Sequence, residues 1–205
     1  SNLSFSDDSG LFQKLNHKIS YIKGEKTNIK ITLPEDMVFF NIFKKQTIKS
    51  GIGYDIHRLN KNTKVGLKLC GVKIPYSKLI GHSDADVALH ALTDALFGAI
   101  GTGDIGTWFP PTEPKWKNAD SSIFLTCANK EVGKKGFEIS NIDLTIICEE
   151  PKINCYSGDM TQFLSSTLNL SLDRINVKAT TTEQLGFTGR KEGIAALCTV
   201  MLVEK

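Results

Sequence analysis

The order of the predicted elements favours an α/β (α+β) domain in which helices pack on one face of a single mixed sheet. Strand patterns come first along the chain, and from about residue 84 helical patterns alternate with strands. This order is typical of a sheet covered by a layer of helices. The chain of 205 residues is long enough for one such domain with a modest additional segment, and it contains no internal repeats.

Residues 1–49 are predicted to form an N-terminal extension with no assigned function, ahead of a domain over residues 50–205. The extension is rich in Lys, Asn, Ser and Ile and contains no catalytic pattern. Residues 29–33 alternate between apolar and polar like a strand, and Pro34 ends that pattern. The chain begins with Ser1 rather than Met, which is compatible with a missing upstream targeting sequence.

Within the domain, residues 53–57 read as a strand, and residues 67–75 read as a strand pair that bends at Gly71. The longest helical pattern covers residues 84–100, and its apolar positions occupy more than one face, so a well-buried helix is expected. Ser83 and Asp86 match a capping box at its start. The other predicted elements are helices over 119–135 and 155–168 and strands over 141–148, 175–179 and 194–203.

Composition argues against several classes of protein. No apolar run approaches the roughly 20 residues that a membrane-spanning helix needs. The formal net charge is +3 and the Lys residues are scattered, so neither a nucleic acid nor a membrane is predicted as a partner. The five cysteines are an odd number without a C-x-x-C pair, which argues against a disulfide framework and a thiolate zinc knuckle.

Polar residues in two of the predicted elements indicate a metal site. Asp55 and His57 are two residues apart in a strand, so their side chains point to the same side. His90 and Asp94 belong to a polar stripe at four-residue intervals along an otherwise apolar helix. Asp55, His57 and His90 form a two-His, one-carboxylate set with an open fourth position, as in catalytic zinc sites. If His82, in the preceding loop, were a fourth ligand, the site would be closed and structural.

A polar run near the end of the chain is suited to phosphate groups. The three consecutive threonines Thr180–Thr182 offer hydroxyls and backbone N–H groups, and Glu183 could hold a hard cation that bridges phosphates. Phe187 and Arg190 follow closely, and an arginine pairs well with phosphate. The alternative is an ordinary polar loop leaving a strand. Residues 103–106 give a weaker signal, because their two glycines allow the backbone to approach a ligand.

Five motifs, in this order and spacing, resemble the 2-C-methyl-D-erythritol 2,4-cyclodiphosphate synthase family over residues 51–205. They are GIGYDIHRL at 51–59, GHSDADVALHALTDALFG at 81–98, GDIG at 103–106, NVKATTTE at 176–183 and LGFTGR at 185–190. The resemblance implies a metal-dependent lyase of non-mevalonate isoprenoid synthesis. In its reaction the 2-phosphate of 4-diphosphocytidyl-2-C-methyl-D-erythritol 2-phosphate attacks the β-phosphorus of the same molecule, which releases CMP and leaves a cyclic diphosphate. The substrate supplies its own nucleophile, so the protein needs only to fold it and neutralise charge.

The resemblance also implies cofactors. Asp55, His57 and His90 look like zinc ligands, and the zinc ion would orient and polarise a phosphate oxygen. Glu183 looks like a ligand of a second divalent cation, Mg²⁺ or Mn²⁺.

Catalytic roles are implied for His82, Thr181 and Asp104. His82 would lie next to the transferring phosphate, and Thr181 would stabilise the transition state. Residues 104–106 would contact the erythritol diol, residues 151–152 the cytosine, and residues 180–183 the diphosphate. The residues implied to contact the substrate are Asp55, His57, His82, Ser83, Asp104, Ile105, Gly106, Phe109, Glu113, Pro151, Lys152, Thr180, Thr181, Thr182, Glu183, Phe187 and Arg190.

The chain departs from the family pattern at three places. Residues 109–113 read Phe-Pro-Pro-Thr-Glu where the family often has Phe-Pro-Asp-Thr-Asp. Glu149 and Glu150 stand where small or amide residues are usual in the cytosine loop, and backbone contacts are expected there. The extension is expected to have no counterpart in the family.

The resemblance further implies a homotrimer with active sites between adjacent subunits. One subunit would supply the zinc ligands and its neighbour the nucleotide residues around Glu183. The extension on a plastid-type pathway predicts a plastid stroma, of apicoplast or chloroplast type, with a bacterial cytoplasm as the alternative.

Two other functions remain as alternatives. One is a zinc-dependent phosphohydrolase that uses the same three ligands with water in the open position. The other is a non-enzymatic, nucleotide-binding module with a structural zinc ion held additionally by His82.

Overall fold

The structure is a computed structural model that describes residues 8–25, 28, 30–34, 36–37 and 46–205. The chain divides into two units, Ser1–Lys45 and Gln46–Lys205. In the first unit helix α1 spans Asp8–Lys14. The strand predicted at residues 29–33 is wrong for residues 30–33, which belong to no strand, and residue 29 lies outside the described residues. The Asp36 carboxylate accepts hydrogen bonds from the backbone N–H groups of Thr32 and Leu33, which favours a turn.

The second unit is built on a five-stranded sheet in the order β4-β1-β7-β5-β6. Strand β1 is antiparallel to β4 and β7, whereas β5 is antiparallel to β7 and parallel to β6, so the predicted mixed sheet is confirmed. The predicted boundary between residues 49 and 50 falls inside β1. The strands are β1 (Ile48–Leu59), β4 (Leu79–Ile80), β5 (Phe137–Ile147), β6 (Ile175–Thr180) and β7 (Gly193–Glu204).

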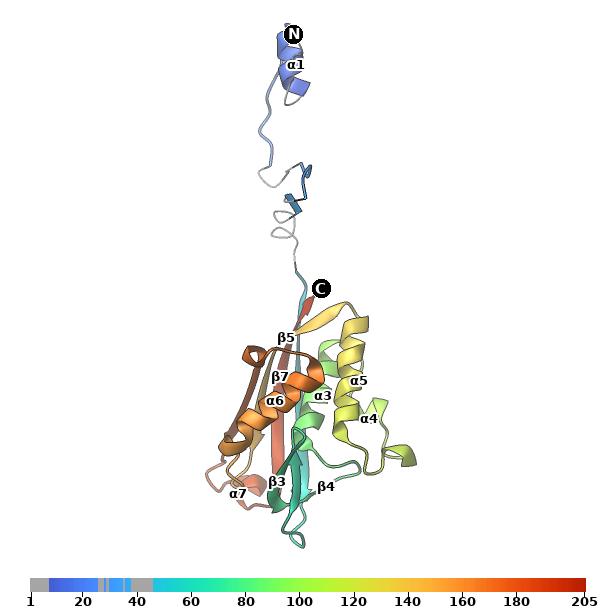
Figure 1. The fold of residues 1–205 in the computed structure, drawn as a ribbon, viewed down its shortest axis with the longest axis vertical. Helices are drawn as coiled ribbons and strands as arrows, with labels where there is room; N and C mark the ends of the chain where they lie inside the picture. Colours follow the sequence, from blue (N-terminus) through green and yellow to red (C-terminus); the bar gives the residue numbers. More distant parts are fainter. Residues whose placement is uncertain (1–7, 26–27, 29, 35, 38–45) are drawn as a thin grey trace. The chain divides into compact units, whose positions relative to one another are not determined.

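Three helices cover one face of this sheet, as predicted (Figure 1). Helix α3 (Val87–Ala99) lies over β1 and β7, α5 (Ser121–Lys134) packs beside α3 and contacts β5, and α6 (Ser157–Leu168) contacts β6. The predicted strand pair forms a separate two-stranded sheet. The remaining elements are β2 (Gly66–Leu69), β3 (Val72–Ser77), α4 (Ile105–Trp108), α7 (Gly186–Gly189) and the short 3₁₀ helices η1 (Pro114–Trp116), η2 (Asn154–Tyr156) and η3 (Leu172–Arg174).

Helix α3 lies unusually close to β1 because the strand has glycine where the helix crosses it. A Cβ atom at Gly51 would lie 2.0 Å from the carbonyl oxygen of Ala95, and one at Gly53 would lie 1.8 Å from that of Ala91. No side chain fits in this contact. The close approach also brings His90, one residue before Ala91, next to the strand that carries Asp55 and His57.

We expect Gly53→Ala to lower the free energy of unfolding by about 3 kcal/mol or more, because the helix would have to move off the strand. Chemical denaturation monitored by circular dichroism measures this loss. The matched control is Gly98→Ala in α3, where the nearest atom to an added Cβ is 3.9 Å away. That variant should be neutral or slightly stabilising, and equal stability of the two variants would contradict the packing argument.

The start of α3 differs from the predicted capping box. Its N-cap is Asp86 rather than Ser83, and the fully buried Asp86 carboxylate accepts a hydrogen bond from the Leu89 N–H at 3.1 Å. The same carboxylate accepts from the N–H groups of Cys70 and Gly71, at 2.9 and 2.7 Å, and so ties the β2–β3 hairpin to the helix. Ser83 is thereby left free to face the candidate site.

The opposite face of the sheet exposes apolar side chains of β1 and β7, with Ile52 70% and Tyr54 52% exposed. Tyr54 and Leu197 are direct cross-strand partners, so these side chains form a continuous strip. The strip consists of Ile52, Tyr54, Ile56, Leu197 and Met201.

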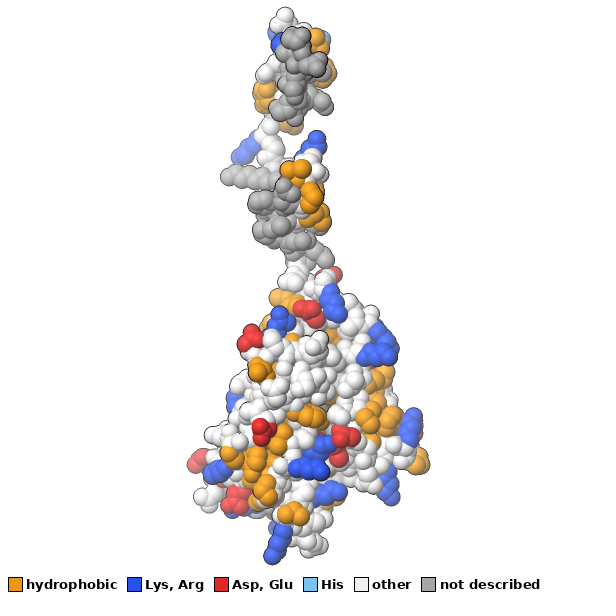
Figure 2. All heavy atoms as spheres, viewed as in Figure 1, with side chains coloured by type: hydrophobic (Ala, Val, Ile, Leu, Met, Phe, Trp, Pro, Cys, Tyr) orange, Lys and Arg blue, Asp and Glu red, His pale blue; other side chains and the backbone are white. Residues whose placement is uncertain are grey.

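Charge is mixed on the surface of this unit. On the face drawn in Figure 2, basic side chains are interspersed with acidic ones rather than gathered in one basic stripe. In the described part of the chain, no helix is both long enough and apolar enough to span a bilayer.

Candidate active site

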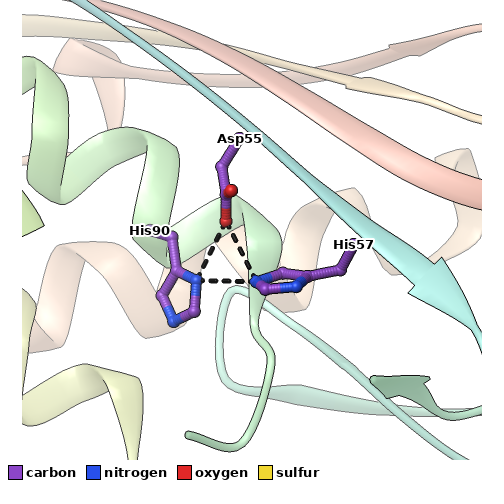
Figure 3. Close-up of side chains that lie close together, drawn as sticks. All are labelled: Asp55, His57 and His90. Atoms are coloured by element: carbon purple, nitrogen blue, oxygen red, sulfur yellow. Dashed lines mark hydrogen bonds and ion pairs between the residues drawn. The ribbon is translucent and has the colours of Figure 1, made fainter. Parts of the chain in front are cut away.

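Asp55 and His57 on β1 and His90 on α3 point toward one another (Figure 3). The Nδ1 atom of His90 lies 2.9 Å from Oδ2 of Asp55 and 3.0 Å from Nε2 of His57. The distance from His57 Nε2 to Asp55 Oδ2 is 3.1 Å, so the three atoms form a nearly equilateral triangle. Strand alternation places the first two side chains on the helix-covered face, and the glycine contact brings the third to them.

The two histidines keep Asp55 in the ionised form, which is the form that a metal ion binds. Burial by itself raises the pKa of Asp55, but the hydrogen bonds to His57 and His90 outweigh it and hold that pKa well below its ordinary value. Burial lowers the pKa of His57, whereas the hydrogen bond and the charge of Asp55 outweigh burial and raise it. Asp55 is therefore ionised at neutral pH.

The triangle fits a zinc ion. Tetrahedral zinc with bonds of about 2.0–2.1 Å places its ligand atoms roughly 3.3 Å apart, so each side chain needs to move by only a few tenths of an ångström. Two imidazole nitrogens and a carboxylate oxygen are also donors that zinc prefers. Among the described residues, this is the only group of three or more side chains that could hold a metal ion, and His82 does not belong to it.

A pocket of about 240 Å³ opens beside the triangle. Five further residues predicted to contact the substrate line it, namely His82, Ser83, Ile105, Gly106 and Phe109. Sequence reasoning missed the other three lining residues, which are Pro111, Trp116 and Phe124. The ring centroids of Phe109 and Phe124 are 4.4 Å apart, and Trp116 stands edge-on to both rings. No spacing signal marks this aromatic wall, because its members come from a loop, a 3₁₀ helix and α5.

Asp94, the second residue of the polar stripe on α3, forms a hydrogen bond to the loop that lines this pocket. Its Oδ1 atom accepts a hydrogen bond from the Ile105 N–H at 2.7 Å, and partial burial raises its pKa. Asp104, the residue before Ile105, is the N-cap of α4. Its carboxylate accepts hydrogen bonds from the N–H and the hydroxyl of Thr107. Asp104 does not line the pocket itself.

We expect Asp94→Ala to raise the KM for the substrate by about ten- to a hundredfold, because the loop loses a hydrogen bond to a charged group. Zinc content should not change, since Asp94 is outside the ligand triangle. Steady-state kinetics with metal analysis measures both quantities. Asp94→Asn keeps an acceptor oxygen and should show a smaller increase, and a wild-type KM in Asp94→Ala would show that the bond does not position the loop.

A second, smaller pocket of about 160 Å³ lies at the carboxyl ends of the parallel strands β5 and β6. This is the edge of a parallel sheet at which ligands commonly bind. Four predicted substrate contacts line it, namely Pro151, Lys152, Thr180 and Thr181. The other lining residues are Cys148, Glu149, Ile153, Asn154 and Ala179.

The turn after β6 is held by Glu149, one of the residues that depart from the family pattern. Glu183 and Gln184 both have left-handed backbone conformations, with φ of 52° and 65°, which is costly for residues other than glycine. Glu149 Oε1 accepts from the N–H groups of Thr182 and Gln184, at 3.0 and 3.2 Å. The Thr181 hydroxyl donates to Glu183 Oε1 at 2.8 Å. No sequence signal marked Glu149 for this role.

Six of the predicted contacts line neither pocket, namely Asp104, Glu113, Thr182, Glu183, Phe187 and Arg190. Glu113 forms an ion pair with Lys115, and the Arg190 guanidinium donates to Glu192 at 3.0 Å. Phe187 lies in α7. The structure does not bring these residues to the ligand triangle.

The two pockets have no lining residue in common. Strand β7 lies between β1 and β5, and β6 follows β5, so the strands that carry the two pockets are two to three strand spacings, or roughly 10–14 Å, apart. One chain therefore presents two separate pockets.

The sequence of the second unit matches an established family description, the "YgbB family", over residues 48–203. This match covers more than half of the chain. The chain belongs to the YgbB family. Within it, the "Bifunctional enzyme IspD/IspF" of Wolbachia sp. subsp. Brugia malayi (strain TRS) is 47% identical over 207 residues, which cover 98% of this chain and 51% of that relative.

Solved structures agree with this assignment to the YgbB family. The structure of the bifunctional IspDF from Campylobacter jejuni has a TM-score of 0.75 and 42% identity and covers 100% of this chain and 55% of that one. A structure of 2C-methyl-D-erythritol-2,4-cyclodiphosphate synthase in a bound form with CDP has a TM-score of 0.69 and 36% identity. That match covers 75% of this chain and 99% of the other. The chain thus spans about half the length of the bifunctional relatives and almost the whole length of the synthase.

These matches confirm the predicted fold class and the resemblance to the cyclodiphosphate synthases. The division into an extension over residues 1–49 and a synthase domain over residues 50–205 stays a prediction. The family match begins at residue 48, whereas the matches to the bifunctional relatives cover 98% and 100% of this chain and so include residues before 48.

Proposed function

We propose that this chain converts 4-diphosphocytidyl-2-C-methyl-D-erythritol 2-phosphate to 2-C-methyl-D-erythritol 2,4-cyclodiphosphate and CMP, a step of non-mevalonate isoprenoid synthesis. An oxygen of the 2-phosphate forms a bond to the β-phosphorus, and the bond from that phosphorus to the oxygen shared with the α-phosphorus breaks. That bridging oxygen leaves with CMP. The reaction needs no protein nucleophile, so the protein contributes positioning and charge stabilisation.

The observation that carries this proposal is the ligand triangle of Asp55, His57 and His90 beside the 240 Å³ pocket. Zinc is the proposed ion, and when bound it polarises a phosphate oxygen. Asp55, His57 and His90 would hold the ion beside the pocket. His82 and Ser83 line the same pocket, and they would donate hydrogen bonds to the transferring phosphate.

The other side of the pocket receives the erythritol group. Ile105 and Gly106 line this side of the pocket, where Asp94 holds the Ile105 N–H. Asp104, the N-cap of α4, would accept hydrogen bonds from the diol. The aromatic wall behind them limits access of water to the reacting phosphates.

The 160 Å³ pocket is the proposed nucleotide half of the site. Pro151 and Lys152 would contact the cytosine, and Thr180, Thr181 and Thr182 would bind the diphosphate. Glu183 would hold a second cation, Mg²⁺ or Mn²⁺, which would neutralise phosphate charge. Phe187, Arg190 and Glu113 would reach the substrate only after the local ion pairs rearrange. The CDP complex of the similar synthase supports a cytidine nucleotide as the ligand.

A homotrimer would join the two half-sites. The exposed apolar strip on the helix-free face of the sheet is the surface that neighbouring subunits would cover. The triangle of one subunit would then face the nucleotide pocket of the next. The two bifunctional relatives named above come from Wolbachia and Campylobacter, which favours the bacterial cytoplasm over the plastid stroma as the location.

Incubation of the purified chain with the CDP-linked substrate, Zn²⁺ and Mg²⁺ tests the proposed reaction. The expected products are CMP and the cyclic diphosphate in equal amounts, resolved by ³¹P NMR. Linear phosphates would identify the phosphohydrolase instead, and binding without turnover would identify the nucleotide-binding module.

A further inference from the structure

A chain of polar side chains continues from the back of His90 away from the ligand triangle. The Nε2 atom of His90 lies 2.8 Å from the hydroxyl of Ser121, at the first residue of α5. The Ser121 hydroxyl lies 2.5 Å from Oδ1 of Asp84, and the Ser121 N–H donates to Oδ2 of Asp84. Lys68 on β2 donates to the same Asp84 oxygen at 2.7 Å and to Asp120 at 2.7 Å.

The direction of the hydrogen bonds follows from which groups can donate. Lys68 carries only donors, and an ionised Asp84 carries only acceptors. Burial raises the pKa of Asp84, but the hydrogen bonds from Lys68 and Ser121 outweigh burial and lower it below its ordinary value. The Ser121 proton therefore points at Asp84, and the free lone pairs of the Ser121 oxygen face His90. The only way for His90 to complete this bond is to donate from Nε2.

A proton on Nε2 has a direct consequence for the other ring nitrogen. A neutral imidazole with its proton on Nε2 has a lone pair on Nδ1, and Nδ1 is the atom that faces Asp55 and His57. Ser121 itself is fully buried, so water does not compete for the bond.

We propose that Ser121, oriented by Asp84 and Lys68, is a positioning residue that keeps the His90 proton on Nε2 and so presents Nδ1 to zinc. This inference rests on the proposed zinc site. Groups that orient a metal-bound histidine in this way commonly change metal affinity by 10- to 100-fold when they are removed.

Ser83 is the competing partner of the same nitrogen. Its hydroxyl lies 3.0 Å from His90 Nε2, but no carboxylate accepts the Ser83 proton as Asp84 accepts that of Ser121. The bonds recorded for Ser83 lead to His90, to Ser121 at 3.5 Å and to the backbone of Ala85. The Ser83 proton is therefore available to a ligand in the pocket, which suits its proposed contact with phosphate.

The first test compares zinc affinity, measured by competition with a chromophoric chelator, in the wild type and Ser121→Ala. We expect Ser121→Ala to bind zinc about 10- to 100-fold more weakly while circular dichroism is unchanged. The control Thr93→Ala removes another fully buried hydroxyl of the same region, which donates to the Leu89 carbonyl and not to His90. It should keep wild-type zinc affinity, and so should Ser83→Ala.

The second test observes the bond itself by proton NMR of the zinc-loaded protein. The wild type should show a slowly exchanging, downfield imidazole N–H signal from His90, which disappears in Ser121→Ala and persists in Thr93→Ala and Ser83→Ala. Wild-type affinity with a retained signal in Ser121→Ala would overturn the proposal and identify Ser83 as the partner.

If Ser121→Ala does not fold, Asp84→Asn tests the same series of hydrogen bonds, because Asp84 orients the Ser121 hydroxyl. Loss of the charged acceptor should weaken zinc binding about tenfold, and wild-type affinity would contradict the inference. A wild-type protein that binds no zinc would overturn the proposed zinc site together with this inference. A wild type that binds zinc as tightly as Ser121→Ala would overturn the inference alone.

Discussion

His90→Ala is expected to lose its bound zinc and at least about a thousandfold of its activity, which corresponds to roughly 4 kcal/mol of transition-state stabilisation. The physical reason is that Asp55 and His57 alone leave two tetrahedral positions without protein ligands. The fold should persist, because the contact of α3 with β1 depends on glycines rather than on the imidazole. Metal analysis, circular dichroism and a CMP-release assay measure the three quantities.

His82→Ala is the matched comparison, since His82 lines the same pocket but lies outside the ligand triangle. It should retain one zinc ion per chain and lose activity through the missing contact to the transferring phosphate. Loss of zinc from His82→Ala would instead support a closed, structural zinc site with four protein ligands.

Mixed trimers of His90→Ala and Glu183→Ala should recover activity that neither variant has alone. The first variant lacks the zinc half of the site and the second lacks the cation ligand of the nucleotide half. If each site combines halves from two neighbours in a ring, an equal mixture leaves about a quarter of the sites with both halves intact. The separation of the two pockets within one chain is the structural reason for this expectation.

The measurement is activity after the two variants are unfolded and refolded together, with each variant refolded alone as the control. Light scattering establishes the trimer, and mass spectrometry establishes that it contains both variants. Absence of recovered activity in such mixed trimers would mean that both halves of each site come from one chain.

Much of the fold was predictable because its signals are local. The apolar pattern of residues 84–100 predicted the buried helix that became α3, and the strands predicted over residues 141–148, 175–179 and 194–203 became β5, β6 and β7. Prediction failed where two side chains could make the same hydrogen bond and the sequence does not show which of them makes it. Ser83 and Asp86 can both cap a helix, and Asp86 does so because the N–H groups of the β2–β3 hairpin also converge on it. At residues 30–33 alternation suggested a strand, but the Asp36 carboxylate bonds their backbone in a turn.

The sequence by itself determined the family and the three members of the ligand triangle. Backbone geometry puts residues two apart on a strand, such as Asp55 and His57, on the same side. It also puts residues four apart on a helix, such as His90 and Asp94, on one stripe. Asp55, His57 and His90 could therefore be recognised without a structure. Only the tertiary structure decided what supports them. Ser121 meets His90 across 31 residues of chain, and Glu149 meets Thr182 across 33. Such contacts depend on how α5 packs on α3 and how β5 pairs with β6, and no local pattern encodes that arrangement.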